Sequence, residues 1–188
     1  MGIDGKTLRT KDDTYELDAL VLATGFDAIT GPLLAIDFRG RGGLRLRDKW
    51  ASGARTYLGL GTVGFPNLFT ITGPLSPSVL ANMPTAIEQH VDWIGDCLVY
   101  MRDHDLAVIE ATADAEDGWV AHTAEVAMGT LYPKANSWYL GSNIPGKPRQ
   151  FGVYLGGFNN YRERCNAIAQ SGYEGFALRQ SAGEPART

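Results

Sequence analysis

The chain has 188 residues, of which 44% are hydrophobic and 20% charged, an ordinary composition for a globular protein. Its 17 basic and 21 acidic side chains give a net charge of −4, which argues against a nucleic-acid partner and against an anionic membrane surface. The two cysteines lack CxxC spacing, and no apolar run approaches the roughly 18 residues of a membrane span. We therefore expect an unsecreted, cytoplasmic protein with neither a disulfide framework nor a zinc site.

The first 26 residues join a polar segment to an apolar one. Residues 3–17 are polar, contain turn residues and predict a weak hairpin. Residues 18–23, Asp-Ala-Leu-Val-Leu-Ala, form an apolar run between turn residues, which is typical of a strand buried on both faces of a parallel sheet. Thr-Gly-Phe follows at residues 24–26, and its glycine indicates a close approach of the backbone to a neighbour.

Two glycine-rich segments have the composition of nucleic-acid or nucleotide sites, but their context favours turns. Residues 37–47 alternate leucine with arginine, which predicts a solvated hairpin; an RNA-binding segment is disfavoured because the chain is acidic. Residues 59–64 match GxGxxG, yet the dinucleotide fingerprint requires a helix to begin inside the motif. Phe-Pro-Asn follows at residues 65–67, so we interpret the motif as a turn between two strands.

The middle of the chain predicts a strand, a shaped loop and a helix N-terminus. Residues 68–72 form an expected strand that ends at Gly73-Pro74, and a loop with two more prolines leads into a helix with Pro84 in its first turn. Proline there loses no hydrogen bond, so the free N–H groups and the positive end of the helix dipole face a ligand. The expected buried stripe of this helix consists of Ile87, Val91, Ile94, Leu98 and Met101.

The metal-ligating residue types are scattered along the chain. His90, His104 and His122 show no spacing typical of a metal site, and we expect each to be solvated or to support a neighbouring site. Cys97 and Cys165 both fall in segments that predict helices. We therefore expect no metal.

The second half predicts two helices around a long loop. Asp114 precedes a helix whose expected buried side holds Trp119, Val120, Ala127 and Leu131. Residues 133–150 form a loop with three prolines; loops of this length are usually lids or binding loops, so Trp138 either contacts a ligand or pins the loop to the core. Residues 151–155 predict a final strand. Residues 159–170 predict a helix that buries Tyr161, Cys165 and Ile168 and stops at Gly172.

Four motifs, in this order, resemble the C-terminal third of Baeyer–Villiger monooxygenases, flavoenzymes that insert one oxygen atom beside a ketone carbonyl. They are residues 18–26, residues 65–69, Gly73-Pro74 with Ser76-Pro77-Ser78, and Ser137-Trp138 with residues 143–148. The loop 76–83 and the run 87–93 look most similar to phenylacetone and steroid monooxygenases. The resemblance covers about residues 14–178.

The resemblance implies an α/β fold, namely the C-terminal part of a flavoprotein with two dinucleotide-binding domains. Residues 1–22 would close an NADP domain and lead through the Ala-Thr-Gly linker. Residues 23–180 would be the C-terminal part of an FAD domain, and residues 181–188 a disordered tail. The implied cofactors are FAD and NADP(H), the implied substrates a ketone and O₂, and the implied partners the missing N-terminal domains of the same enzyme.

The same resemblance assigns roles to individual positions. Met83, with Asn82 beside it, matches the residue whose backbone touches the flavin ring. Trp138 matches the tryptophan of a mobile loop that contacts NADP, and Ser78, Val79 and Leu80 match the loop of the substrate pocket.

Several parts of the family pattern are absent from the chain. The phosphate-binding glycine fingerprints and the catalytic arginine lie upstream in family members, so the chain holds no expected catalytic residue. We expect a C-terminal fragment that is inactive alone and does not bind FAD tightly. A non-catalytic interaction module and another class of FAD- and NADPH-dependent monooxygenase are the alternatives.

Overall fold

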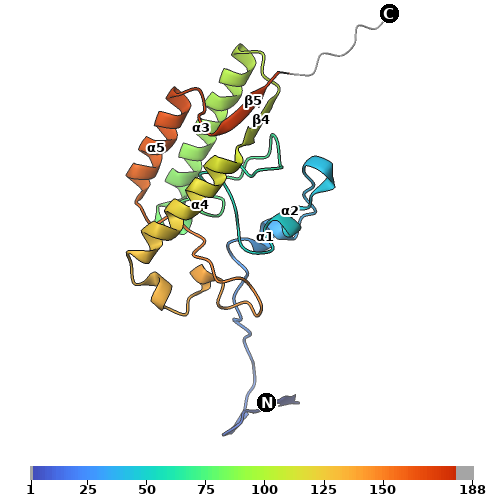
Figure 1. The fold of residues 1–188 in the computed structure, drawn as a ribbon. Coiled ribbons are helices and arrows are strands. Elements are labelled where there is room, and N and C mark those ends of the chain that lie inside the picture. The colour runs from blue at the N-terminus through green and yellow to red at the C-terminus, as the bar shows by residue number, and fades with distance from the viewer. Residues whose placement is uncertain (1, 181–188) are drawn as a thin grey trace, which may run out of the picture.

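The computed structural model describes residues 2–180, and the expected disordered tail at 181–188 lies outside these residues. Three helices and a two-stranded sheet form the main body, while a small N-terminal sheet lies at the far end of an extended segment (Figure 1). None of the helices among the described residues combines the length and the apolarity that a membrane crossing requires.

The N-terminal sheet is an exposed antiparallel meander. Its strands are β1 (Gly2–Asp4), β2 (Thr7–Arg9) and β3 (Thr14–Glu16), so the predicted hairpin is confirmed and gains a third strand. The prediction of a strand at residues 18–23 is wrong, because the segment pairs with no other strand among residues 2–180. Val21 is 85% exposed and Phe26 is 86% exposed. A strand buried on both faces needs covering layers, and the described residues supply none.

Residues 27–55 fold into short helices around a small core. These are α1 (Gly31–Leu34), the 3₁₀ turn η1 (Arg41–Gly43) and α2 (Leu46–Lys49). The hairpin expected at 37–47 is reduced to a single bridge between Arg39 and Arg45, since α2 begins at the following residue. The buried cluster of this region consists of Leu46, Trp50, Ala54 and Phe65.

The GxGxxG segment is a buried turn, as predicted, and no helix begins within it. The N–H of Tyr57 donates to the Gly61 carbonyl at 2.8 Å, which closes the turn. A Cβ at Gly59 would lie 2.6 Å from the Cβ of Ser76, so this glycine permits close contact with the following loop. The strand expected at residues 68–72 is wrong: Thr72 has a left-handed φ of +49°, and its N–H donates to a side chain rather than to a strand.

Helix α3 (Met83–Asp103) begins where the sequence predicts but buries a different stripe. Its buried side chains are Ala86, His90, Trp93, Cys97 and Met101. The expected residues Ile87, Val91 and Leu98 are exposed, so the predicted stripe was wrong apart from Met101 and the partly buried Ile94. Both stripes have helical period, and His90 belongs to the buried one because its ring finds hydrogen-bond partners inside.

The remaining helices pack on α3 and enclose an aromatic core. Helix α4 (Ala113–Met128) is capped by Thr112, two residues before the predicted start; it buries Trp119 and Ala127 and partly buries Val120, whereas Leu131 lies beyond it and is exposed. Helix α5 (Phe158–Gln170) buries the three predicted residues. The antiparallel strands β4 (Val108–Ala111) and β5 (Phe176–Arg179) were not predicted.

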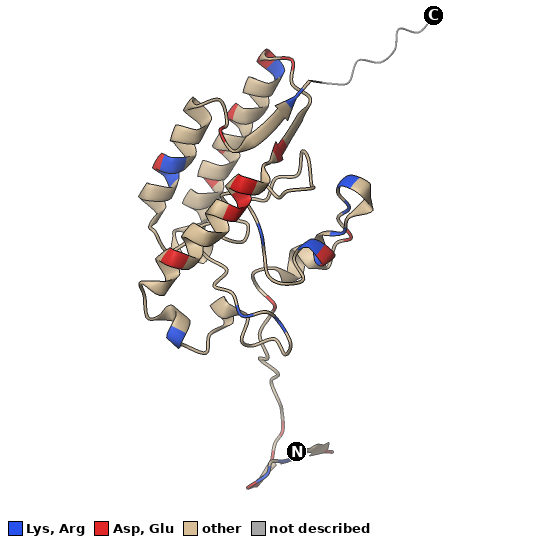
Figure 2. Ribbon diagram, in the orientation of Figure 1, with Lys and Arg blue, Asp and Glu red and all other residues tan. Residues whose placement is uncertain are grey.

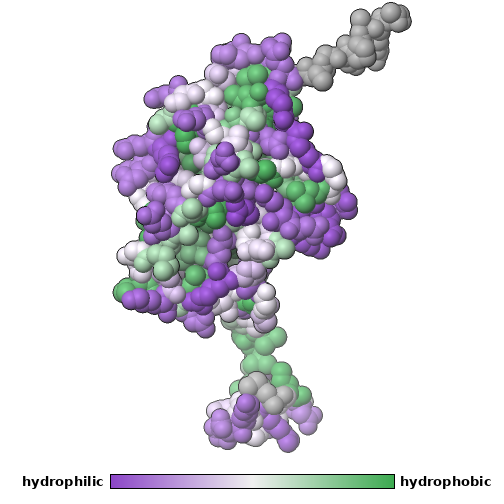
Figure 3. All heavy atoms as spheres, in the orientation of Figure 1, coloured by the Kyte–Doolittle hydropathy of each residue, from purple (hydrophilic) through white to green (hydrophobic). Residues whose placement is uncertain are grey.

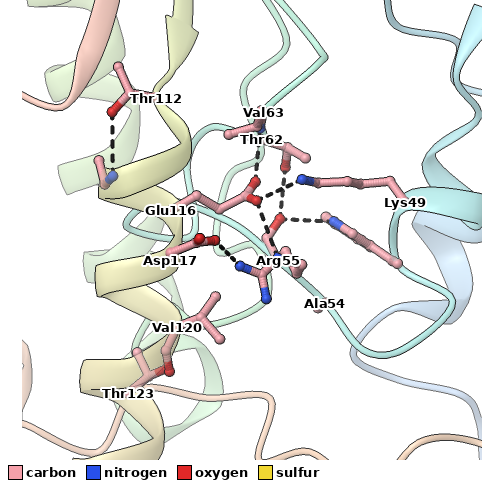
Figure 4. Close-up of polar contacts among 12 residues, drawn as sticks. Lys49, Ala54, Arg55, Thr62, Val63, Thr112, Glu116, Asp117, Val120 and Thr123 are labelled. Atoms are coloured by element: carbon pink, nitrogen blue, oxygen red, sulfur yellow. Dashed lines mark hydrogen bonds and ion pairs between the residues drawn. The ribbon is translucent and has the colours of Figure 1, made fainter.

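A buried carboxylate joins three parts of this body. Glu116 of α4 accepts hydrogen bonds from the Val63 N–H at 2.9 Å and from Lys49 Nζ at 2.7 Å, and Arg55 pairs with the same carboxylate at 3.4 Å (Figure 4). Glu116 therefore ties α4 to α2 and to the GxGxxG turn. Other acidic residues are spaced along α4, and basic residues lie on α5 (Figure 2).

Candidate cofactor and substrate site

The loop that precedes α3 is held by residues 152–154, which follow the long loop. The Leu75 N–H donates to the Gly152 carbonyl, and the Tyr154 N–H donates to the Ser76 carbonyl, both at 2.8 Å. Ser76 is fully buried, and its Oγ donates to the Gly73 carbonyl at 2.7 Å. The strand expected at residues 151–155 is therefore wrong: the segment makes these isolated hydrogen bonds to the loop but forms no regular strand.

The predicted substrate loop is a single 3₁₀ turn, η2 (Ser78–Leu80), with three different environments. Ser78 is buried and has a φ of +43°, a backbone conformation that non-glycine residues rarely adopt. Leu80 packs on the buried cluster around Leu140 and Phe151, whereas Val79 is exposed. The strained turn thus holds Val79 outward, where an apolar ligand could contact it.

The start of α3 leaves one backbone donor free. Asn82 caps the helix, and its side chain accepts from the Thr85 N–H at 3.4 Å. Pro84 has no N–H, and the Ala86 N–H donates to the Asn82 carbonyl. Met83, which is half-buried, is therefore the residue of this first turn whose N–H donates no hydrogen bond within residues 2–180.

His90 fixes the backbone from the opposite side. Its Nδ1 accepts from the Thr72 N–H at 2.8 Å, so the neutral ring carries its proton on Nε2 and donates to the Tyr161 hydroxyl at 2.8 Å. Tyr161 in turn donates to the Leu58 carbonyl at 2.6 Å. Burial lowers the pKa of His90 to about 4 and raises that of Tyr161, so both groups stay neutral. His90 is thus not solvated; it supports the loop at Gly73.

The other histidines lie apart from His90. His104 is exposed and stacks on Tyr100, and His122 packs beside Trp119 and Tyr154. Within residues 2–180, no group of three or more His, Cys, Asp and Glu side chains could hold a metal ion. Cys97 and Cys165 are both free thiols in the core.

The long loop is folded on itself and against residues 26–27, which directly follow the linker. Arg149 donates to the carbonyls of Pro133 and Ala135, while Lys147 pairs with Asp27. Trp138 is 39% exposed and stacks on Tyr139 with ring centroids 4.0 Å apart. The loop contains two 3₁₀ turns, η3 (Tyr132–Lys134) and η4 (Trp138–Leu140). Trp138 therefore lies at the surface of the loop rather than in the core.

The structure brings some of the predicted site residues together. Residues 78–80 and Met83 share the approach to α3, and Leu80 reaches the base of the long loop. Trp138 lines a cavity beside α1 and α2, and residues 78–83 are not part of that cavity's lining. Lys147 belongs to the motif at residues 143–148, but the sequence assigns no role to its side chain, because the ion pair with Asp27 joins segments far apart in the sequence.

Comparison with known proteins extends the likeness over most of the chain. No protein-family model matches. An acetone monooxygenase (methyl acetate-forming) of Gordonia sp. is 48% identical over 165 residues, which are 87% of this chain and 31% of that protein. A Baeyer–Villiger monooxygenase of Pseudooceanicola batsensis is 44% identical over 161 residues, 86% of this chain and 29% of that protein. The structure of an oxidised steroid monooxygenase bound to NADP superposes with a TM-score of 0.87 at 49% identity, over 96% of this chain and 34% of that one.

The chain is homologous to Baeyer–Villiger monooxygenases. It spans about a third of the length of the curated relatives and solved structures that it matches. Its fold is accordingly a mixed α/β part of a flavoprotein with two dinucleotide-binding domains. One relative carries a different name: a phenazine N-monooxygenase of Lysobacter antibioticus is 41% identical over 164 residues, 87% of this chain and 30% of that protein.

Proposed function

We propose that the chain is the C-terminal part of a Baeyer–Villiger monooxygenase that uses FAD, NADPH and O₂ to convert a ketone into an ester or lactone. The observation that carries the proposal is the 48% identity over 165 residues to an acetone monooxygenase. The superposition on an NADP-bound steroid monooxygenase supports the same assignment. The two buried free thiols are in keeping with a cytoplasmic enzyme.

The residues at the start of α3 fit a flavin. When bound, FAD supplies the redox chemistry with O₂, and NADPH supplies the reducing hydride. The free N–H of Met83 would donate to the edge of the flavin ring where negative charge gathers. The positive end of the 21-residue helix α3 would add roughly 0.3–1 kcal/mol of stabilisation there. Asn82 contributes by capping the helix, which keeps the Met83 N–H directed outward.

The substrate and coenzyme would contact neighbouring parts of the chain. Val79 would provide an apolar wall for the ketone, with Ser78 and Leu80 fixing the turn that presents it. Trp138, exposed on the folded loop, would contact the nicotinamide coenzyme. The catalytic arginine would come from the part of the enzyme outside this chain.

A chimera tests the activity. Replacing the matching segment of the Gordonia acetone monooxygenase with this chain should give an enzyme that consumes NADPH and O₂ and forms methyl acetate from acetone. Phenazine should be tested as a second substrate of the same chimera. Oxidation of its nitrogen would support the alternative activity that the N-monooxygenase relative suggests. NADPH oxidation without either product would contradict the proposal, and failure to bind FAD would favour the non-catalytic module.

The role of Met83 has a test of its own in the chimera. Met83→Pro removes the N–H at the first helical position, where proline is well tolerated. We expect it to weaken binding of reduced FAD about ten-fold, because a hydrogen bond to a charged group is lost. Met83→Leu keeps the N–H and should bind as the parent does. If both variants bind reduced FAD with equal affinity, the Met83 N–H does not contact the flavin.

A further inference from the structure

The three methionines among residues 2–180 lie in very different surroundings. Met101 is 6% exposed in the core, and Met83 is half-buried at the start of α3. Met128, the last residue of α4, is 73% exposed. Because a methionine sulfur is oxidised in proportion to its exposure, Met128 is the most open of the three to a dissolved oxidant.

Met128 also lies beside the base of the long loop. The C-terminal end of α4 leads towards this loop, which is drawn in orange in Figure 1. Met128 lines a cavity of about 280 Å³, and Pro133, Leu140 and Phe151 line it from the side of the loop and its end. The thioether is apolar and adaptable, so in its reduced form the side chain suits this largely apolar hollow.

The cavity is also lined by Arg149, whose guanidinium ties the loop to itself. Its Nη2 donates to the carbonyls of Pro133 at 3.1 Å and Ala135 at 2.6 Å. Its Nη1 donates to the Ser142 Oγ at 3.0 Å. One guanidinium thus carries several hydrogen bonds of the loop, and a strong acceptor placed beside it would compete for the same N–H groups.

Oxidation of Met128 supplies such an acceptor. Hydrogen peroxide transfers one oxygen atom to the thioether sulfur: the O–O bond breaks, the S=O bond forms, and the other oxygen leaves with both hydrogens as water. The sulfur is oxidised by two electrons and the peroxide is reduced by two. The product is a polar sulfoxide, whereas the thioether sulfur is only a weak acceptor.

We propose that Met128 is an oxidation site, and that its sulfoxide draws the Arg149 guanidinium away from the carbonyls of Pro133 and Ala135 and so loosens residues 133–150. Trp138 belongs to that loop and is held less firmly after the oxidation. The proposal rests on the exposure of Met128 and on the cavity that it shares with Arg149, and it is independent of the reaction proposed above.

Treatment of the full chain with hydrogen peroxide tests the site. Mass spectrometry of its peptides should show Met128 oxidised about ten-fold faster than Met101, because exposure governs the rate. Chymotrypsin should then cleave within residues 133–150 about three-fold faster than in the untreated chain. Methionine sulfoxide reductases should restore the slow cleavage. Equal oxidation rates at Met128 and Met101, or unchanged cleavage after oxidation of Met128, would overturn the proposal.

Three variants assign the effect to named side chains. Met128→Leu keeps an apolar side chain of similar volume but forms no sulfoxide, so peroxide should leave its cleavage rate unchanged. Met101→Leu is the matched control and should respond to peroxide as the unmodified chain does. Arg149→Met removes the guanidinium, so the loop should be cleaved quickly with or without peroxide. A peroxide response in Met128→Leu, or further acceleration by peroxide in Arg149→Met, would contradict the proposed contact.

Discussion

At the scale of single residues, His90 shows how a polar group becomes part of a core. The ring is fully buried, and both of its nitrogens have partners: the Thr72 N–H on one side and the Tyr161 hydroxyl on the other. The neutral ring therefore loses nothing on burial, whereas a charged ring would lose its hydration and its acceptor atom. Because Thr72 directly precedes Gly73, the protonation state of His90 bears on the geometry of the candidate site.

This arrangement makes stability depend on pH. His90 titrates near pH 4 when folded but near 6.5 when unfolded, so between these values the unfolded chain binds a proton that the folded chain does not. Stability should thus be full above pH 6.5 and should fall by about 3 kcal/mol as the pH drops to 4. Urea unfolding at a series of pH values measures this.

Two variants test whether His90 causes this dependence of stability on pH. His90→Gln cannot take up the proton and should flatten the stability profile between pH 6.5 and 4. His122→Gln is the control: burial and the charge of Arg164 lower the pKa of His122 too, but its ring is less enclosed, so most of the slope should remain. A profile for His90→Gln as steep as that of the unmodified chain would contradict the role of His90.

At the scale of elements, the long loop is fastened at two places to residues 26–27, which directly follow the Ala-Thr-Gly linker. Lys147 pairs with Asp27, and the Asn143 side-chain amide donates to the Phe26 carbonyl at 3.1 Å. The stem of Lys147 passes over Gly141, where a Cβ would lie 3.0 Å from the lysine Cδ and where φ is +71°. Glycine at this position thus permits both the turn and the reach of the lysine.

Breaking the ion pair should loosen the loop without unfolding the body. Lys147→Met should increase the rate of proteolytic cleavage within residues 133–150 about five-fold, since a partly buried pair contributes about 1 kcal/mol. Asp27→Lys combined with Lys147→Asp should restore the slow rate. Lys134→Met, an exposed lysine of the same loop without a described ion pair, serves as the control. If the double variant is cleaved as fast as Lys147→Met, the pair does not hold the loop.

The helices and strands differ in how well the sequence predicts them. The stripe of α5 was predicted because its buried face is apolar and its exposed face polar. On α3 apolar residues lie on both faces, and only tertiary contacts with Tyr161 and Thr72 explain why His90 faces inward. Strands β4 and β5 were missed because short strands lack a strong period. In the candidate site, the helix start at Met83 was predicted correctly, whereas the hydrogen bonds that join Leu75 and Ser76 to residues 152–154 link distant segments and could not be.

At the scale of the whole molecule, two apolar surfaces have no covering layer among residues 2–180. One is the extended segment, where Leu20, Val21, Leu22 and Phe26 are exposed, and Figure 3 shows it as a hydrophobic band between the body and the N-terminal sheet. The other is the outer face of α3 at Ile87, Val91 and Leu98. Uncovered apolar faces of this kind are typical of surfaces that contact another protein chain or domain.

The isolated chain should therefore self-associate through the extended segment. Sedimentation velocity over a range of concentrations should show a growing fraction of dimers or larger species. Val21→Lys combined with Phe26→Lys should lower that fraction, because exposed apolar area is removed from the contact. Ile36→Lys also replaces an exposed apolar side chain, but one that lies outside the segment, so association should persist. A chain that sediments as a monomer at every concentration, or one that responds equally to both changes, would show that the segment is stable without a covering partner.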